Sequence, residues 1–532
     1  MRTLFIFILC LFISTTVISQ SGAKKILKLT EGRQAFLKRN YWGALDSYRQ
    51  VLKENPDGAI INYRVGETQY ALKHYDIAKQ YLERALELDD DVDVDLYLML
   101  GKTYHRLEEL DNAKEYYRMY REISSDGRSN RHNVSGLIAQ CDYAKQMMAS
   151  PVEVEIRNLD KEINSRFDDY APSVTADGKM MVYTSRRPSE TSNAVDENGD
   201  HKYFEDIYYS EWNEEEQNWE SGERFSSNVN SETHDAVLSI NGTGDRLFVY
   251  KNDSDHAGDI YVSRFTGDWS LPEKLPKPIN TSYFESSISM TADGSTMYFI
   301  SERPSGMGRG DVYMSRKTSE TNWSKPKNLG EVINTPFDEK FVFIHPNGNT
   351  LFFASNGHLT LGSYDIFRSE FKDGQWSDPV NLGYPINTVN EESTFSMTAD
   401  NKRLLISAEY HEGLGERDIY EIDLSNTDIL HSLNIDSDLL GKRSNVTVYG
   451  RISIQKGQKP GAFLDVAAYD NKGEVEVFKT RTDRRGNYEM SLPRDKNYLL
   501  KVSLSAGVIK QEKFNLKNML PSEIDYQLNL DY

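Results

Sequence analysis

Acidic side chains recur through the middle of this 532-residue sequence at spacings that could serve chemistry. One set follows a recurring step from an aliphatic residue to Asn, and its members are Asp168, Asp169, Asp235, Glu285, Glu339 and Glu391. Carboxylates at one position of several repeats could form a ring around a central opening. The same groups could instead accept hydrogen bonds at turns and strand ends, and we expect this structural role.

Three other motifs look functional at first sight. Arg309-Gly310-Asp311 spells an adhesive tripeptide, but Asp311 also belongs to a triplet that recurs in every repeat, which favours a structural role. The glycines of residues 306–310 do not follow the Rossmann pattern, so phosphate binding is not expected. The acidic run 89–95 (DDDVDVD) lacks the glycine and the terminal Glu of a calcium loop, so it is predicted to be a solvated turn.

Sequence motifs of enzymes are absent. Neither a Gly-x-Ser-x-Gly nucleophile elbow nor a His-Glu-x-x-His zinc motif occurs, and the chain has only 10 histidines. Its 2 cysteines are Cys10 and Cys141, and Cys141 lies in an apolar helical pattern, as a small buried hydrophobic residue would. We therefore predict no enzyme, no cofactor, and no catalytic, cofactor-binding or metal-binding residues.

The length and charge of the chain limit its organisation and partners. A chain of 532 residues is too long for one hydrophobic core, so three or four domains are expected. The net charge of -20 would repel nucleic acid and anionic membranes, so neither is an expected partner.

The N-terminus has the pattern of a secretory signal peptide over residues 1–19. One positive residue precedes a short apolar run and a stretch of small residues, so Gln20 would begin the mature chain. The alternative of a membrane anchor is disfavoured because the apolar run is short. A lipoprotein is disfavoured because Cys10 follows Leu9 inside the apolar run.

Residues 25–148 show a period of about 34, with Gly and Ala always twelve positions apart. The pairs are Gly32 and Ala44, Gly66 and Ala78, and Gly101 and Ala113. Small residues suit a close helix crossing, and a Tyr or Leu would fill the adjoining gap. The segment resembles tetratricopeptide repeats. Helices are predicted over 26–38, 41–54, 59–72, 75–88, 94–107 and 110–123, with a capping helix over 130–148. Their concave groove could bind a peptide, or the repeats could be a structural arm packed on the next domain.

Residues 153–424 contain five copies of one unit of about 53 residues. Each copy carries a triplet of the Asp-Ile-Tyr type, and the five aspartates are Asp206, Asp259, Asp311, Asp365 and Asp418. Asp-Gly and Asn-Gly turns and a Trp-Ser-x-Pro motif divide the copies into four short strands. The repeat resembles the WD40-like blades of TolB-type proteins, which implies a five-bladed β-propeller.

The fifth unit lacks its Trp-Ser-x-Pro motif, but Asn158-Leu159 and Ile163-Asn164 match the missing piece. A strand before the first unit is therefore predicted to complete the last blade and to close the ring. Six blades are the alternative. The first unit also has a polar insertion at about 187–204, which is predicted to be a mobile loop.

Residues 445–532 alternate short strands with Gly and Asn turns, which predicts a small β-sandwich after a linker over 425–444. The stretch from Thr482 to Tyr488 resembles the regulatory domain of carboxypeptidases, a transthyretin-like fold. The resemblance implies that Tyr488 packs in the core and that Gly486 makes a turn. The predicted fold class is multidomain: an all-α tetratricopeptide solenoid, a five-bladed β-propeller and a small transthyretin-like β-sandwich.

This order of domains resembles the PorE-like, OmpA-family-associated periplasmic proteins of Bacteroidetes. Such proteins normally end in an OmpA-like domain that binds peptidoglycan, whereas this chain ends at Tyr532, so direct peptidoglycan binding is not expected. The resemblance implies a non-catalytic periplasmic scaffold at the outer membrane, linked to type IX secretion or gliding. Its partner would be an outer-membrane β-barrel of the PorP/SprF kind or a secretion-system protein. The alternative function is a propeller that binds a glycan or a peptide at its mouth.

Overall fold

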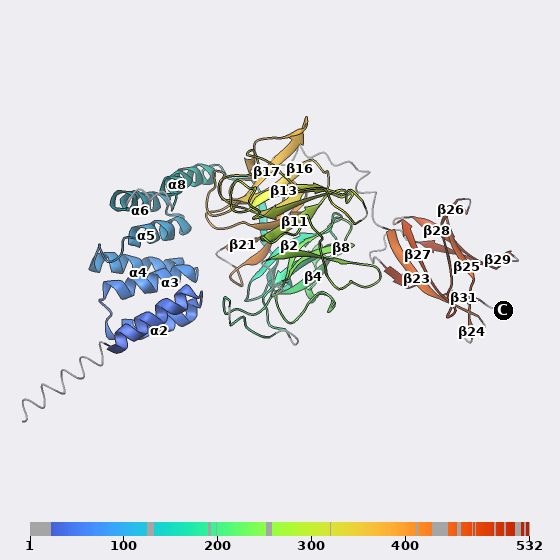
Figure 1. Ribbon diagram of the computed structural model, residues 1–532, viewed down its shortest axis with the longest axis horizontal. Coiled ribbons are helices and arrows are strands. Elements are labelled where there is room, and N and C mark those ends of the chain that lie inside the picture. The colour runs from blue at the N-terminus through green and yellow to red at the C-terminus, as the bar shows by residue number, and fades with distance from the viewer. Residues whose placement is uncertain are drawn as a thin grey trace, which may run out of the picture.

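A computed structural model describes most of the chain, as helices followed by a ring of β-sheets and a separate pair of sheets (Figure 1). The described residues are 23–124, 132–189, 193–197, 199–251, 258–319, 321–410, 413–427, 445–454, 459–470, 472–473, 475–493, 496–504, 507–515, 523–525 and 528–530. The predicted signal peptide 1–19 and most of the predicted linker 425–444 lie outside them. Among the described helices, none combines the length and apolar character needed to cross a bilayer.

The N-terminal helices stack in pairs along one side of the ring (Figure 1). The first helix spans 23–37. The others are α2 (Tyr41–Glu54), α3 (Ala59–Ala71), α4 (Tyr75–Leu88), α5 (Leu96–Arg106), α6 (Leu110–Ile123) and α8 (Val134–Met148). The acidic run 89–95 connects α4 and α5 as a turn, in which the Asp89 and Asp93 carboxylates accept N–H bonds from Asp91 and Asp95 at 3.1 and 3.0 Å.

Each helix pair packs tightly around a repeat glycine. A Cβ atom on Gly66 would lie 2.7 Å from Cγ of Leu82 on the next helix. Gly32 and Gly101 have no space for a side chain either, because the rings of Tyr48 and Tyr117 fill it. The repeat alanines Ala44, Ala78 and Ala113 are fully buried. Glycine at these crossings thus lets a large side chain of the neighbouring helix enter the core.

Cys141 lies on α8 in the core of the helical region, 1% exposed and unpaired. Burial raises the pKa of its thiol to about 12. A thiol with such a pKa is protonated and unreactive at neutral pH. The prediction of a small buried hydrophobic role is confirmed.

The central residues form five antiparallel sheets, which we call the ring. The first sheet has β2 (Asp169–Val174), β3 (Met180–Ser185), β4 (Asp206–Asn213), β5 (Asn218–Trp219) and β6 (Glu223–Arg224). The second has β7 (Asp235–Ile240), β8 (Arg246–Lys251), β9 (Asp259–Arg264) and β10 (Glu273–Lys274). The third has β11 (Glu285–Met290), β12 (Thr296–Ser301), β13 (Asp311–Arg316) and β14 (Lys327–Asn328). The fourth has β15 (Glu339–Ile344), β16 (Thr350–Ser355), β17 (Asp365–Lys372), β18 (Gln375–Trp376) and β19 (Val380–Asn381).

The fifth sheet closes the ring with a strand from the start of the region. It contains β20 (Thr394–Met397), β21 (Arg403–Ala408), β22 (Asp418–Asp423) and the early strand β1 (Glu155–Asn158), which precedes the short helix α9 (Asp160–Ile163). β1 pairs antiparallel with β22, so Ile156 lies opposite Ile422. The first strands contact one another in the cyclic order β2, β7, β11, β15, β20 and back to β2. The predicted closure by an N-terminal strand is confirmed.

An asparagine clamps each sheet to its own edge segment. The side-chain oxygen of Asn164 accepts the N–H of Ile419 at 2.8 Å, and its amide nitrogen donates to the Ile419 carbonyl at 2.9 Å. The equivalent side chains of the other sheets bond in the same way to the middle residue of the triplet; they are Asn230, Asn280, Asn334 and Asn387. The side-chain amide of the repeated Asn therefore supplies the hydrogen bonds that a neighbouring strand would otherwise give to the backbone of the middle triplet residue.

Hydroxyl groups join most neighbouring sheets. The N–H of Ile240 on β7 donates to the Ser173 hydroxyl on β2 at 2.9 Å, and the N–H of Ile344 on β15 donates to the Ser289 hydroxyl on β11 at 3.0 Å. At the seam between the fourth and fifth sheets, the described residues of the first strands meet through aromatic rings. Phe341 and Phe395 lie there with ring centroids 5.1 Å apart.

The C-terminal strands form two sheets that share one core. One sheet has β23 (Asn445–Ile454), β24 (Lys459–Pro460), β27 (Asn487–Pro493), β30 (Glu523–Asp525) and β31 (Leu528–Leu530). The other has β25 (Asp465–Tyr469), β26 (Glu476–Arg481), β28 (Asn497–Leu504) and β29 (Gly507–Asn515). Tyr488 is buried in the shared core, and Gly486 has a φ of +82° in the turn before β27. Both roles match the sequence expectation.

Candidate ligand-binding site at the mouth of the ring

The repeat carboxylates are bonded within the chain. Glu285 accepts the N–H of Thr281 at 3.0 Å and its hydroxyl at 2.8 Å. The same bonds from the residue four positions earlier recur in all five sheets, at Asp169, Asp235, Glu285, Glu339 and Glu392. All five carboxylates are buried. They fix the turn that leads into each sheet, which confirms the predicted structural role.

The sequence assignment of this set was wrong at Asp168 and Glu391. The structure places Asp169 and Glu392 at the repeat position, and the other two residues lie one position earlier. Spacing alone cannot choose between two adjacent acidic residues, whereas the bond to the residue four positions earlier selects the second. Asp168 instead pairs with Lys202 at 2.8 Å, and Glu391 pairs with Lys340.

The aspartate of each triplet is also structural. Asp311 is fully buried and accepts the N–H of Gly308 at 3.0 Å and the side-chain amide of Asn328 at 2.8 Å. A Cβ atom on Gly308 would overlap the carbonyl oxygen of Phe337, in the turn that leads into β15 of the next sheet. The glycine-rich stretch and the Arg-Gly-Asp sequence therefore build a tight connection between sheets. Neither is presented as a recognition motif.

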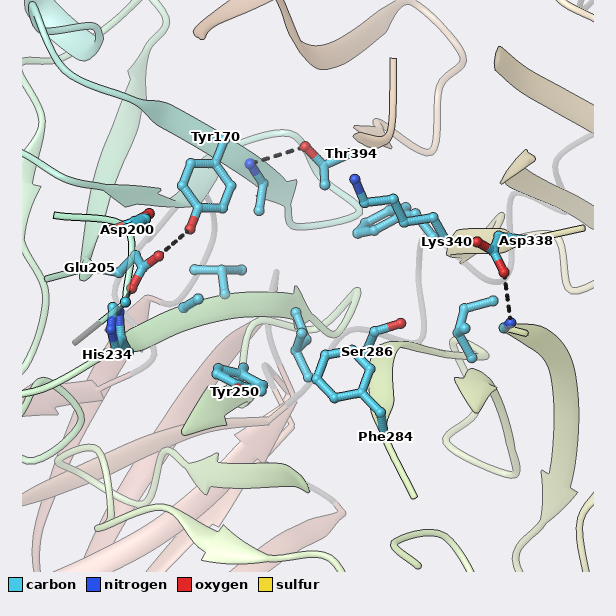
Figure 2. A pocket seen from close by; sticks show the side chains of 18 of the residues that line it. Tyr170, Asp200, Glu205, His234, Tyr250, Phe284, Ser286, Asp338, Lys340 and Thr394 are labelled. Carbon is cyan, nitrogen blue, oxygen red and sulfur yellow. Dashed lines mark hydrogen bonds and ion pairs between the residues drawn. The ribbon is translucent and has the colours of Figure 1, made fainter. Parts of the chain in front are cut away.

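A cavity of about 800 Å³ opens at the mouth of the ring, on the face that carries these connections. In Figure 2, Tyr170, Glu205 and His234 lie on one side of it, and Asp338 and Lys340 lie on the other. Tyr250 and Phe284 lie between the two sides, with ring centroids 6.1 Å apart. A cavity of this size falls within the range of pockets that bind small ligands.

Most charged groups in the cavity wall are paired with one another. Arg186 pairs with Asp200 and lies 3.5 Å from Glu205. His234 contacts Glu205 through Nδ1 and Asp196 through Nε2. The insertion that follows β3 thus pairs with Arg186, which comes directly after β3, and with His234, which directly precedes β7 of the second sheet.

The described part of the insertion is packed against the mouth, which differs from the predicted mobile loop at 187–204. Val195 forms a β-bridge with Tyr203, and Lys202 pairs with both Asp168 and Glu416. Burial alone would raise the pKa of Asp168, but the nearby cations Arg417 and Lys202 hold it below its usual range. The insertion thus contains charges that pair with the ring, such as Lys202, while its residues 193–195 and 197 are exposed to solvent.

The helical repeats dock on the same face of the ring. His105 bonds through Nε2 to the carbonyl of Leu361 at 2.8 Å, and the Arg106 guanidinium donates to the carbonyl of Val389. Leu361 and Val389 belong to the same apolar cluster as the helices. The sequence left open whether the repeats bind a peptide in their groove or pack as an arm on the next domain. At the C-terminal end of α5, the structure shows packing on the next domain.

The first repeat reaches over the cavity. Leu37, at the end of the first helix, and Lys38 and Arg39, in the turn before α2, line the cavity together with residues of the ring. The sequence motifs did not reveal this site, because its wall residues differ from one sheet to the next. Position was the one usable signal: the wall residues His234, Phe284 and Asp338 each directly precede a repeat carboxylate.

The described residues contain no group of three or more His, Cys, Asp or Glu side chains placed to hold a metal ion. The cavity offers aromatic faces, fixed hydrogen-bonding groups and a few cations. These groups suit the binding of a ligand through its surface and charge.

The comparisons with known proteins give a family for the helices. Residues 59–92 and 94–118 match the tetratricopeptide repeat family. Among solved structures, the TPR2B domain of yeast Sti1 in complex with pHsp70 is 19% identical, with a TM-score of 0.21, and the match covers 23% of this chain and 98% of that one. TolB from Acinetobacter baumannii is 13% identical, with a TM-score of 0.31, over 57% of this chain and 71% of that one.

A protein described as putative TolB from Agrobacterium tumefaciens is also 13% identical, with a TM-score of 0.31, over 64% of this chain and 96% of its own. TM-scores at this level carry no argument about the whole chain. Among curated proteins, none matches the sequence. The chain therefore contains tetratricopeptide repeats, which occur in protein–protein interaction modules.

Proposed function

We propose that this chain is a non-catalytic scaffold or adaptor that mediates protein–protein interactions in the periplasm, at the outer membrane. The observation that carries the proposal is the docking of the tetratricopeptide helices on the ring, which leaves a cavity bordered by both. In the same proposal the ring is a five-bladed propeller of the TolB type. The two C-terminal sheets are a transthyretin-like domain related to the carboxypeptidase regulatory domain.

The process and the partner follow from the resemblance to PorE-like proteins of Bacteroidetes. We assign the chain to type IX secretion or gliding machinery, with an outer-membrane β-barrel of the PorP/SprF kind or a secretion-system protein as its partner. The secretory pattern of residues 1–19 supports the periplasmic location. The net charge of -20 agrees with a protein partner in preference to nucleic acid.

Crosslinking and co-purification from cell envelopes test the partner. A defined outer-membrane protein should be recovered with the full chain from crosslinked envelopes. Repeated recovery of no membrane partner would contradict the adaptor function. Cell fractionation, with mass spectrometry of the mature N-terminus, tests export independently and should find Gln20 as the first residue.

Binding of a ligand at the mouth of the ring is the second candidate function. The cavity of about 800 Å³ and its aromatic wall favour it. Calorimetry against envelope peptides and glycans would test this function, and a lack of heat with all of them would count against it. Turnover of a peptide or ester panel that is abolished by one substitution would contradict the non-catalytic role.

A further inference from the structure

The turns that end the first helix of each repeat are equivalent in conformation but differ in what they bind. Arg39, Lys73 and Glu108 all have a left-handed backbone, with φ of 60°, 64° and 60°. In the second repeat, Lys73 forms an ion pair with Glu409 of the ring. In the third repeat, His105 and Arg106, the last two residues of α5, bond to carbonyls of the ring. The second and third repeats thus use polar groups at or directly before these turns for docking.

The turn of the first repeat has no such contact with the ring. Leu37 is 68% exposed, and Lys38 and Arg39 are exposed as well. Among the described residues, neither cation has a side-chain hydrogen bond or an ion pair. Both nevertheless lie in the wall of the cavity.

The remaining cations of the wall are already neutralised. Arg309 lies 3.2 Å from Glu302, Lys340 pairs with Glu391, and Arg186 pairs with Asp200. On the opposite wall, Asp338 accepts the Gly310 N–H at 3.3 Å and the Tyr364 hydroxyl at 3.4 Å. The available positive charge is therefore concentrated on the overhanging turn.

The wall near the middle of the cavity is apolar. Tyr250 and Phe284 present their rings side by side there (Figure 2). Val237, Leu238 and Ile300 add aliphatic surface to the same cavity. A ligand that contacts both this apolar wall and the overhanging turn would combine an apolar body with an anionic group.

We propose that the cavity binds an acidic peptide segment of a partner protein, with carboxylates at Lys38 and Arg39 and an apolar side chain on Tyr250 and Phe284. The proposal deepens the proposed function and rests on the role of the chain as an interaction module. Because the cations belong to the helices and the aromatic rings belong to the ring, the segment would contact both parts at once. The partner would thus recognise the helices and the ring in their docked arrangement.

A pair of short peptides tests the charge requirement on the full chain. The probe is an N-acetylated, C-amidated peptide of sequence Asp-Phe-Leu-Asp, and its control replaces both Asp by Asn. Calorimetry should show binding of the acidic peptide, weakened by raising the salt concentration, and no comparable binding of the Asn peptide. Equal affinity for both peptides, or no binding of the acidic one, would overturn the proposal.

Matched double variants locate the site. K38Q/R39Q removes the two overhanging charges. It should weaken binding about tenfold or more, since the loss of a hydrogen bond to a charged group changes an affinity by at least this factor. R49Q/K53Q removes two exposed charges from α2 and should leave the affinity unchanged. F284A should also weaken binding, because it removes the apolar contact. Unaltered affinity in K38Q/R39Q would refute the site.

Two further outcomes separate this proposal from the broader function. If a neutral oligosaccharide binds in the cavity while the acidic peptide does not, the glycan alternative replaces the peptide. If K38Q/R39Q still recovers the envelope partner in full, the adaptor function stands and the site proposed for its partner is wrong.

Discussion

Replacing Asn164 by Ala tests how the ring is closed. Asn164 is 2% exposed and bonds to both backbone groups of Ile419, a residue 255 positions away. Its amide also donates to the side-chain oxygen of Asn158 at 2.8 Å. The variant N164A removes these bonds without changing the strand sequence of β1 or β22.

The cost can be worked from the bonds that remain. The Ile419 carbonyl keeps the N–H of Leu159 at 3.2 Å, so only the Ile419 N–H is left without a partner. An unsatisfied buried N–H costs about 1–3 kcal/mol, and the lost bond to the carbonyl adds about 0.5–1.5 kcal/mol. N164A should therefore lower the free energy of unfolding of the ring by about 1.5–4.5 kcal/mol.

Asn280→Ala is the matched control. Asn280 makes the same pair of bonds to Ile260, whose carbonyl likewise keeps the N–H of Leu275 at 3.0 Å. The residues it joins are only 20 positions apart in one sheet. Denaturant unfolding followed by tryptophan fluorescence should give similar losses for both variants. Hydrogen exchange should increase at β1 in N164A alone, because only that clamp holds the closing strand.

A loss below about 0.5 kcal/mol in N164A would refute the reasoning, since surface substitutions have effects of that size. Faster exchange of β1 in N280A, to the extent seen in N164A, would show that the clamp has no special role in closure.

Three other substitutions test the remaining arguments. Arg106→Met removes the charged hydrogen bond to the Val389 carbonyl, and such bonds contribute about 1.5–3 kcal/mol. Calorimetry of this variant should therefore show the helices melting separately from the ring. A single unchanged transition would contradict the docking. Burial raises the pKa of Glu339 to about 8, so the folded ring holds a proton that the unfolded chain loses near its ordinary pKa, and the free energy of unfolding should fall as pH rises from about 4.5 to 8. Burial also raises the pKa of Glu392 and Asp365, so E339Q should reduce this slope without abolishing it. An unchanged slope in unfolding measured across that range would count against the buried acid. Gly308→Ala should destabilise the ring more than Gly348→Ala. At the first site the new Cβ overlaps the Phe337 carbonyl, whereas at the second it meets open space and adds only the strain of a left-handed backbone with a φ of +74°. Equal thermal shifts would exclude this explanation.

The sequence predicted the local structure of this protein well where the repeats carry it. The spacing of Gly32, Gly66 and Gly101 located the helix crossings, because only a residue without a side chain leaves room for Tyr48, Leu82 and Tyr117. The closing strand was predictable too, since its Asn-x-x-x-x-Ile-Asn pattern repeats a segment found elsewhere in the chain. A residue that recurs in every repeat indicates a contact that is present in every copy.

Contacts that occur once could not be found in this way. Spacing could not separate Asp168 from Asp169 or Glu391 from Glu392. Choosing one or the other changes the distance to the next repeat by a single residue, out of about 53. Their roles were decided by which carboxylate reaches the turn four residues earlier and which meets a lysine. The polar insertion 187–204 looked mobile for a similar reason, as its partners lie on other sheets.

The chemistry of the mouth also depends on tertiary structure alone. Lys38 and Phe284 are far apart in the sequence and belong to elements with different periods, so no local pattern relates them. They line one cavity because the second and third repeats dock on the ring and carry the first repeat over its mouth. The repeats and their internal bonds were therefore predictable from the order of the amino acids. The docking of one repeat array on the other decided which side chains form a site, because that docking depends on single contacts such as those of His105 and Arg106.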